Sequence, residues 1–145
     1  IGELQPNEAM LFHNMKRGVD RIDNVRALEA PLWSHNLRLA GRVDCVAEFD
    51  GKLSIIDFKG STRKKNPNKI TNYFCQATAY SIMWHEMMGE SIDQIVVLIS
   101  SEDGANQIFV KHPLEFVPEL KRVIDVYYKA NPKLLVEETE TSLFS

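Results

Sequence analysis

The sequence is poor in cysteine, glycine, proline and long apolar runs, and each shortage excludes a class of protein. Its two cysteines, Cys45 and Cys75, cannot form a disulfide scaffold or a four-cysteine metal site, so we expect reduced thiols in a cytosolic compartment. The longest apolar run, residues 95–99, is far too short to cross a membrane, so we expect no membrane partner. Seven glycines and six prolines exclude a collagen-like or disordered chain. The 145 residues, of which 44% are hydrophobic, suffice for one domain with a core.

An excess of positive charge is also missing. The chain has 17 basic and 20 acidic residues and a net charge of −3, which alone argues against a nucleic-acid-binding protein. The charges are unevenly distributed, however, because residues 137–145 contain three acids and no base. Residues 61–69 contain four bases and no acid, and their Asn and Pro favour an exposed loop that can contact phosphates. The alternative is a solvated connector, and the place of this segment in the fold decides between the two.

Hydrophobic periodicity predicts three helices and five strands. Apolar residues at helical spacing predict helices over residues 7–23, 118–129, and from a cap at Thr71 or Asn72 to Met88. Alternating or continuous apolar residues predict strands over residues 25–33, 37–49, 53–58, 94–100 and 106–112. Pro31 is typical of an edge strand, and Trp33 and Trp84 are expected in the core. We expect one α/β (α+β) domain, residues 1–136, with a mixed β-sheet flanked by helices, and a frayed tail, residues 137–145.

The strongest local signal is Asp50-Gly51, which is typical of a two-residue hairpin turn because both residues take positive φ. Counting outward from this turn brings Asp44 opposite Asp57, with Cβ atoms roughly 4.5–5.5 Å apart. The same count brings Arg42 opposite Lys59, and a β-bulge in either strand would break this register. The alternation also predicts one set of apolar residues on a single face of the sheet: Leu37, Leu39, Val43, Cys45, Ala47 and Phe49.

Two directly opposed carboxylates destabilise a strand pair unless another charge offsets them. Lys59 and Arg42 would do so as a surface ion network. A divalent cation would do so more effectively, since Mg²⁺ binds paired carboxylates and keeps positions for water and phosphate. Asp57 ends an apolar strand, where a charge is unfavourable unless it is paired or bound to metal. Spacing alone leaves both explanations open.

Three motifs resemble those of a known enzyme family. Residues 41–44 (Gly-Arg-Val-Asp), 56–59 (Ile-Asp-Phe-Lys) and 76–80 (Gln-Ala-Thr-Ala-Tyr) resemble the G-x-x-D, D-x-K and Q-x-x-x-Y motifs of PD-(D/E)XK nucleases. The RecB-like exonuclease branch, with mitochondrial and phage members, is the most similar. The resemblance covers roughly residues 25–100 and implies a restriction-endonuclease-like core.

The resemblance implies a metal-dependent DNA exonuclease that hydrolyses phosphodiester bonds at single-stranded ends in replication, repair or recombination. Mg²⁺ or Mn²⁺ would be its cofactor. By this resemblance Asp44 and Asp57 hold the metal with the backbone carbonyl of Phe58, and Lys59 orients or deprotonates the attacking water. Glu29, on the neighbouring strand, is a further candidate near the metal; the alternative is a solvated strand residue.

Other residues are implied to bind the substrate. Gln76 and Tyr80 are four apart and share a helix face. In the family such residues hold the helix near the metal strand and contact substrate; the alternative places Tyr80 in the core and Gln76 at its boundary. The implied phosphate-binding residues beside the motif are Ser61, Arg63, Lys64 and Lys65.

One part of the family pattern is missing. RecB-like enzymes usually have an upstream G-x-x-x-H helix whose His completes the metal site, and here His13 stands without the Gly. We therefore expect the His-bearing helix to precede Ile1. Two alternatives stay open, a catalytically impaired DNA-binding module and a structure-selective endonuclease of the same fold. The expected location is the cytoplasm of a bacterial or phage-infected cell, or mitochondria if a transit peptide precedes Ile1.

Overall fold

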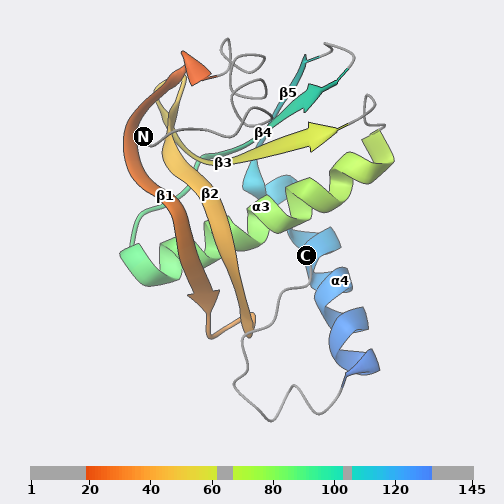
Figure 1. Cartoon of the computed structure of the whole chain (residues 1–145). Helices are drawn as coiled ribbons and strands as arrows, with labels where there is room; N and C mark the ends of the chain where they lie inside the picture. The colour runs from red at the N-terminus through yellow and green to blue at the C-terminus, as the bar shows by residue number, and fades with distance from the viewer. Residues whose placement is uncertain (1–18, 62–66, 103–105, 132–145) are drawn as a thin grey trace.

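A computed structural model describes residues 19–61, 67–102 and 106–131 of the chain. Within these residues a five-stranded sheet has the order β1-β2-β3-β4-β5 (Figure 1). Its strands are β1 (Ile22–Ser34), β2 (Leu39–Phe49), β3 (Lys52–Ser61), β4 (Gln94–Ser101) and β5 (Asn106–Lys111). All neighbours are antiparallel except β3 and β4, which are parallel. The predicted mixed sheet is confirmed, and β1, which contains Pro31, is an edge strand.

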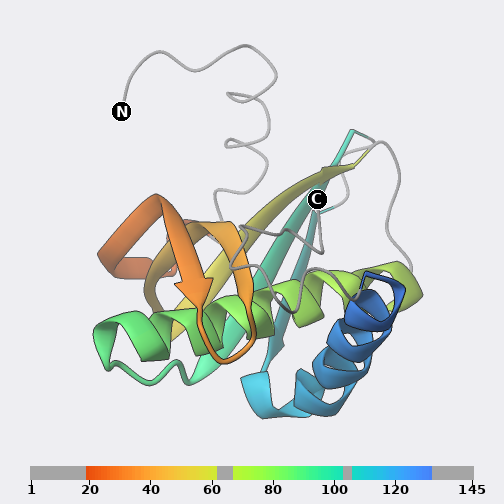
Figure 2. The same ribbon diagram turned by 90° about the horizontal axis from the view of Figure 1, so that it is seen from below.

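Helices cover one face of this sheet. The helix α3 (Pro67–Met88) connects the parallel strands β3 and β4, and the short η1 (Pro113–Phe116) leads into α4 (Val117–Ala130). Figures 1 and 2 show α3 lying across the sheet with α4 beside it. A crossover helix of this kind is the usual connection between parallel strands. None of the helices in the described part of the chain is both long enough and apolar enough to span a membrane.

Several predicted boundaries are wrong. The strand β1 begins at Ile22, so the predicted helix over residues 7–23 does not continue to residue 23, and residues 7–18 lie outside the described ranges. The helix α3 begins at Pro67 rather than at residue 71 or 72, because proline needs no hydrogen-bond acceptor in the first helical turn. The predicted basic loop over residues 61–69 therefore loses residue 61 to β3 and residues 67–69 to α3.

Apolar side chains fill both faces of the central strands. The larger cluster lies between the sheet and α3 and includes Ile55, Val97 and Phe74. A smaller cluster on the opposite face includes Ile56 and Val96. Every residue of β4 is buried, as predicted for a central strand.

The two cysteines and the two tryptophans lie in different surroundings. Cys45 and Cys75 are buried free thiols, and burial raises the pKa of each to about 11. Trp84 is in the core as predicted, but Trp33 is half-exposed. The prediction for Trp33 is wrong because Leu32 faces the core, and strand alternation then turns its neighbour outward.

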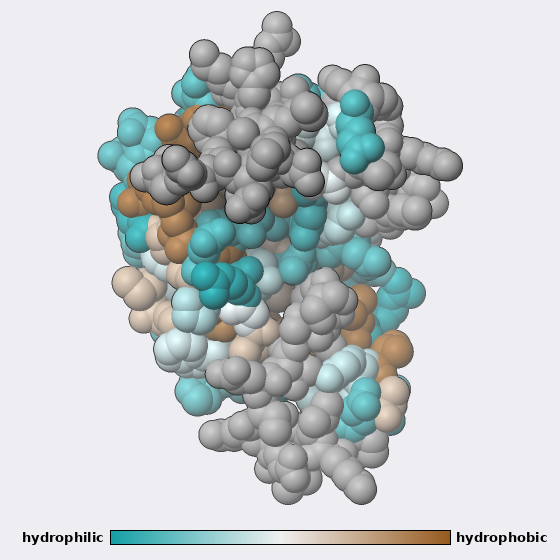
Figure 3. Space-filling model, in the orientation of Figure 1, coloured by the Kyte–Doolittle hydropathy of each residue, from teal (hydrophilic) through white to brown (hydrophobic). Residues whose placement is uncertain are grey.

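Figure 3 shows exposed apolar surface in separate patches over β1 and α4, and Leu28 and Val126 are among the exposed residues of these two elements.

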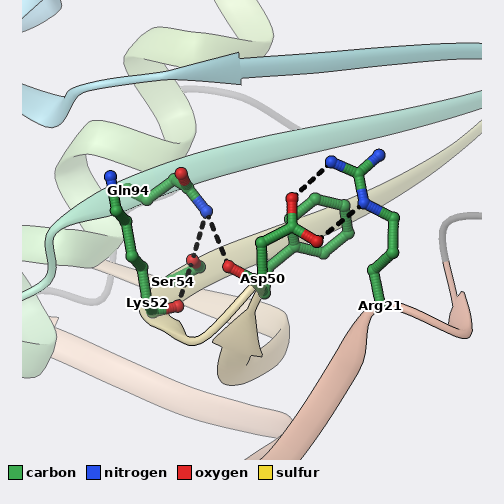
Figure 4. A network of polar contacts seen from close by, with 6 residues as sticks. Arg21, Asp50, Lys52, Ser54 and Gln94 are labelled. Atoms are coloured by element: carbon green, nitrogen blue, oxygen red, sulfur yellow. Dashed lines mark hydrogen bonds and ion pairs between the residues drawn. The ribbon is translucent and has the colours of Figure 1, made fainter.

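The predicted hairpin turn is present between β2 and β3. Asp50 and Gly51 have φ angles of 53° and 80°, as a two-residue turn of this type requires. The Arg21 guanidinium forms two hydrogen bonds with the Asp50 carboxylate (Figure 4). Gln94 Nε2 donates to Phe49 O at 3.0 Å and to Ser54 Oγ at 3.2 Å. These contacts join the turn to β4 and to the residues before β1.

The apolar residues of β2 lie on both faces of the sheet. Val43 and Val46 belong to the cluster against α3, whereas Cys45 belongs to the cluster on the opposite face. The prediction that the apolar residues of this strand share one face is therefore wrong. In the neighbouring strand β1, Glu29 has a positive φ of 46°, so its backbone is irregular between the pairs Leu28–Cys45 and Ala30–Val43, whereas the register of β1 and β2 shifts between Asp23 and Ala27. Both strands then curve across α3 (Figures 1 and 2).

The turn between β1 and β2 is hydrogen bonded to both α3 and α4. Ser34 Oγ donates a hydrogen bond to the Glu86 carboxylate near the C-terminal end of α3, and Leu37 N–H donates to Ser34 Oγ at 2.9 Å. The Tyr128 hydroxyl of α4 donates to the Arg38 carbonyl oxygen. The tip of this hairpin therefore has a defined position relative to α3 and α4.

Candidate active site

The strands β2 and β3 bring two aspartates together just beyond the last regular pair of their ladder. That ladder ends at Cys45 and Ile56, and Asp44 and Asp57 are the next residues along the two strands. Their carboxyl groups are within hydrogen-bonding reach of each other, and Phe58 N–H donates to Asp44 Oδ2 at 2.8 Å. The structure thus joins the two predicted carboxylates, with the Asp44 side chain oriented by the backbone of β3.

Asp57 is almost completely buried. Its residue is 4% exposed, and its Oδ2 atom accepts no hydrogen bond. Lys59 Nζ lies 3.2 Å from this oxygen, close enough for an ion pair but without the geometry of a hydrogen bond. Burial and then the contact with Asp44 raise the pKa of Asp57 to about 8, although the charge of Lys59 lowers it. Without a further positive charge Asp57 is therefore mostly protonated at neutral pH.

Lys59 is held by contacts with three residues. Its Nζ atom lies 3.2 Å from Asp57 Oδ2 and donates a hydrogen bond to Gln76 Oε1 at 3.3 Å. The same atom lies 4.8 Å from the centre of the Tyr73 ring. The Lys59 side chain is 25% exposed, so these contacts do not bury it completely.

A chain of polar contacts continues from Lys59 to β2. Gln76 Nε2 donates to the Tyr80 hydroxyl at 3.0 Å. The Arg42 backbone also hydrogen bonds to this hydroxyl, and burial raises the pKa of the Tyr80 phenol. The predicted pair of Gln76 and Tyr80 therefore connects the lysine of β3 with the backbone of β2. Tyr80 is buried, as its core alternative required, and is also part of this chain of contacts.

Gly41 is required by the position of the Tyr80 ring. A Cβ atom at residue 41 would lie 2.6 Å from Tyr80 Cε1 and 3.1 Å from its hydroxyl oxygen. Real Cβ atoms do not approach other atoms so closely, and Tyr80 is too buried to move aside freely. The glycine of the G-x-x-D motif thus makes room for the tyrosine of the Q-x-x-x-Y motif.

Two further predictions about the surroundings of the site need correction. The regular ladder between β2 and β3 ends at Cys45 and Ile56, so the predicted extension of the hairpin register to Arg42 and Lys59 is wrong. Arg42 is paired with Pro31 on the other side of β2. The reason is the irregularity of β2 near Asp44, since counting outward from a turn assumes an unbroken ladder. Glu29 has an 80% exposed side chain 3.9 Å from the Arg42 guanidinium, which fits its solvated alternative.

Three predicted site residues lie outside the residues that the structure describes: Arg63, Lys64 and Lys65. His13, which lacks the glycine of the family motif, also lies outside them. Ser61 is the last residue of β3, which ends directly before this basic segment. The Phe58 ring packs against the smaller apolar cluster, on the face of the sheet away from α3.

Tyr73 is the site residue that sequence reasoning missed. On α3 it has the spacing of the apolar residues that face the core, and the ring does pack against the larger apolar cluster. The available signal was its spacing, because Tyr73 precedes Gln76 by three residues and so shares its helix face.

The donor set fits a small divalent cation. Two carboxylates, one with a buried oxygen that lacks a hydrogen bond, are the hard oxygen ligands that Mg²⁺ prefers. Across residues 19–61, 67–102 and 106–131, no group of three His, Cys, Asp or Glu side chains could hold a metal. Other ligands would therefore come from backbone carbonyls, water or substrate oxygens, which is common for Mg²⁺ at phosphate sites.

Comparisons with known proteins agree with this arrangement. The chain matches the family model of the PD-(D/E)XK nuclease superfamily over residues 7–138. It is 46% identical over 44 residues to the human Mitochondrial genome maintenance exonuclease 1, a match that covers 30% of this chain and 13% of the relative. The mouse protein of the same name is 46% identical over 64 residues, 44% of this chain and 19% of the relative. The matches thus span less than a fifth of these curated relatives.

A solved structure supports the fold. A crystal structure of a candidate exonuclease from Eubacterium rectale superimposes with a TM-score of 0.62 and 12% sequence identity. The match covers 96% of this chain and 57% of that protein. At this identity the likeness concerns the fold alone, including the mixed sheet and its helices.

Proposed function

Because this chain belongs to the PD-(D/E)XK nuclease superfamily, we propose that it is a metal-dependent exonuclease acting on single-stranded DNA ends. One observation carries the proposal. Asp44 and Asp57 meet beside Lys59, and Asp57 keeps a buried oxygen without a hydrogen-bond donor. Relatives that are named exonucleases for genome maintenance support this reaction and a role in DNA replication, repair or recombination.

We assign a Mg²⁺ or Mn²⁺ ion to the carboxylates of Asp44 and Asp57 and to the backbone carbonyl of Phe58. When bound, such a cation polarises the phosphodiester and stabilises the negative charge of the transition state. The Phe58 N–H fixes one oxygen of Asp44, so that the other oxygen remains directed for coordination. The positive charge of the cation also favours the ionised form of Asp57, which burial disfavours.

Lys59 acts on the reacting groups in this proposal. Its ammonium group hydrogen bonds to the attacking water or to a phosphate oxygen, and Gln76 holds it near Asp57. Tyr80 holds Gln76 in turn and contacts the substrate strand with it. The remaining phosphates of the strand bind to Ser61 at the end of β3 and to Arg63, Lys64 and Lys65 beyond it.

The first experiment measures cleavage of end-labelled single-stranded DNA by the full chain with Mg²⁺, with Mn²⁺ and with EDTA. We expect shortening of the labelled strand that requires the cation. Asp57→Asn and Lys59→Ala should each reduce cleavage by at least 100-fold. Asp125→Asn and Lys129→Ala, which replace exposed residues of α4, should leave it unchanged. Metal-independent cleavage, or cleavage that survives both site variants, would refute the proposal.

The second experiment addresses the two alternative functions. Only two acidic side chains meet in the described site, which favours a catalytically impaired DNA-binding module as the alternative. Calorimetry with Mn²⁺ tests this, because a module that binds DNA without binding Mn²⁺ would replace the enzyme proposal. Circular single-stranded DNA tests the endonuclease alternative, since an exonuclease requires an end and leaves the circle intact.

A further inference from the structure

Tyr73 lies against the lysine of the site and has no role assigned by the motifs. We propose that Tyr73 is a positioning residue, whose ring face holds the Lys59 ammonium beside Asp57 through a cation–π contact. The separation of 4.8 Å between Lys59 Nζ and the ring centre is within the range of this interaction. The inference about catalysis rests on the function proposed above, whereas the contact itself does not.

Lysine needs such a contact because its side chain is long and rotates freely. The contact with Asp57 Oδ2 lacks hydrogen-bond geometry, so it attracts the ammonium group without orienting it. The hydrogen bond to Gln76 Oε1 is long, at 3.3 Å. The face of the Tyr73 ring contacts the ammonium group from a third direction. Together the three contacts restrict a side chain that is still 25% exposed.

The helix α3 positions the Tyr73 ring beside Lys59. Tyr73 and Gln76 are three residues apart, so both reach Lys59 from adjacent turns of α3. The ring also packs against the larger apolar cluster, which limits its own movement. Because the interaction uses the ring face and not the hydroxyl, phenylalanine should replace Tyr73 and an aliphatic residue should not.

The kinetic test compares Tyr73→Phe with Tyr73→Leu, with Tyr73→Met as a second aliphatic variant. Tyr127→Leu, which removes a partly buried tyrosine of α4, is the matched control. We expect about a tenfold lower kcat for the two aliphatic variants, an unchanged KM, and a kcat within twofold of wild type for Tyr73→Phe. Urea unfolding of each variant checks that the loss does not follow stability. An aliphatic variant with a wild-type kcat would overturn the inference, and so would an equal loss in Tyr73→Phe.

A second test needs no catalysis and no metal. The full chain is labelled with ¹³C-lysine, and the ε-methylene signal of Lys59 is assigned from its loss in Lys59→Arg. The field of an aromatic ring moves a signal above its face to lower chemical shift. We expect this displacement in the wild type and Tyr73→Phe, and its disappearance in Tyr73→Leu. An identical Lys59 signal in the wild type and Tyr73→Leu would overturn the contact.

The two tests separate this inference from the proposed function. If the wild type cleaves no DNA but the lysine signal behaves as expected, the proposed function fails and the contact stands. If the wild type cleaves DNA and Tyr73→Leu cleaves equally well, the positioning role fails and the proposed function stands.

Discussion

Replacing Asp57 with asparagine should stabilise the metal-free protein more as the pH rises. The pKa of Asp57 is about 8 in the folded chain because of its burial and its contact with Asp44, against an ordinary value of 3.8. Between these two values the folded state binds more protons than the unfolded state, so the free energy of unfolding falls as the pH increases. Asparagine has nearly the same shape and does not titrate, so it removes this dependence.

The size of this change in stability follows from the difference between the folded and the ordinary pKa of Asp57. Each pH unit between the two pKa values is worth about 1.4 kcal/mol, and about three such units lie between pH 5 and the raised pKa of about 8. The advantage of Asp57→Asn over the wild type should therefore grow by up to about 4 kcal/mol from pH 5 to pH 9. We expect at least about 2 kcal/mol, because the Asp44 carboxyl shares the proton and takes part of the change.

Urea unfolding in EDTA at several pH values between 5 and 9 measures this difference. Asp125→Asn, an exposed substitution on α4, is the control and should follow the wild type at every pH. Added Mg²⁺ should stabilise the wild type at pH 8 and leave Asp57→Asn unchanged, because ligands stabilise only the state that binds them. A constant difference between Asp57→Asn and the wild type across this range would refute the reasoning.

Two further predictions concern packing and a single hydrogen bond. Gly41→Ala should lower the free energy of unfolding in urea by about 1–3 kcal/mol, because its Cβ atom would lie 2.6 Å from the Tyr80 ring; a wild-type value would show that the ring moves aside without strain. Tyr128→Phe should lower it by about 0.5–1.5 kcal/mol through loss of the hydrogen bond to the Arg38 carbonyl. Tyr127→Phe is the control for the second change, and equal losses in both variants would contradict the assigned bond.

The hairpin could be predicted because its register depends on local chemistry. Asp50 and Gly51 favour positive φ, and the five residue pairs nearest the turn follow directly from that preference. The meeting of Asp44 and Asp57 followed from the same count, although the regular ladder stops one residue earlier. The nuclease fold followed from three motifs whose spacing matches that of the family.

The end of the regular ladder between β2 and β3, before Arg42 and Lys59, could not be predicted, because it depends on tertiary packing. The strands β1 and β2 curve to cover α3, and the side-chain alternation of β2 changes near Asp44. The distortion includes a positive φ at Glu29, a residue type with no preference for that conformation. Tyr73 was missed because its place in the apolar repeat of α3 is also that of an ordinary core residue, so only the tertiary contact with Lys59 distinguishes it.

The helix α3 contacts the site near one end and the β1–β2 turn near the other. Tyr73 lies against Lys59, and Glu86 holds Ser34 of the turn, so the two attachments are about 20 Å apart along one helix. The same helix therefore connects the turn to the two side chains that contact Lys59, Tyr73 and Gln76. A substitution in the turn that shifts α3 would change the contacts of Lys59 while every residue of the site stays the same.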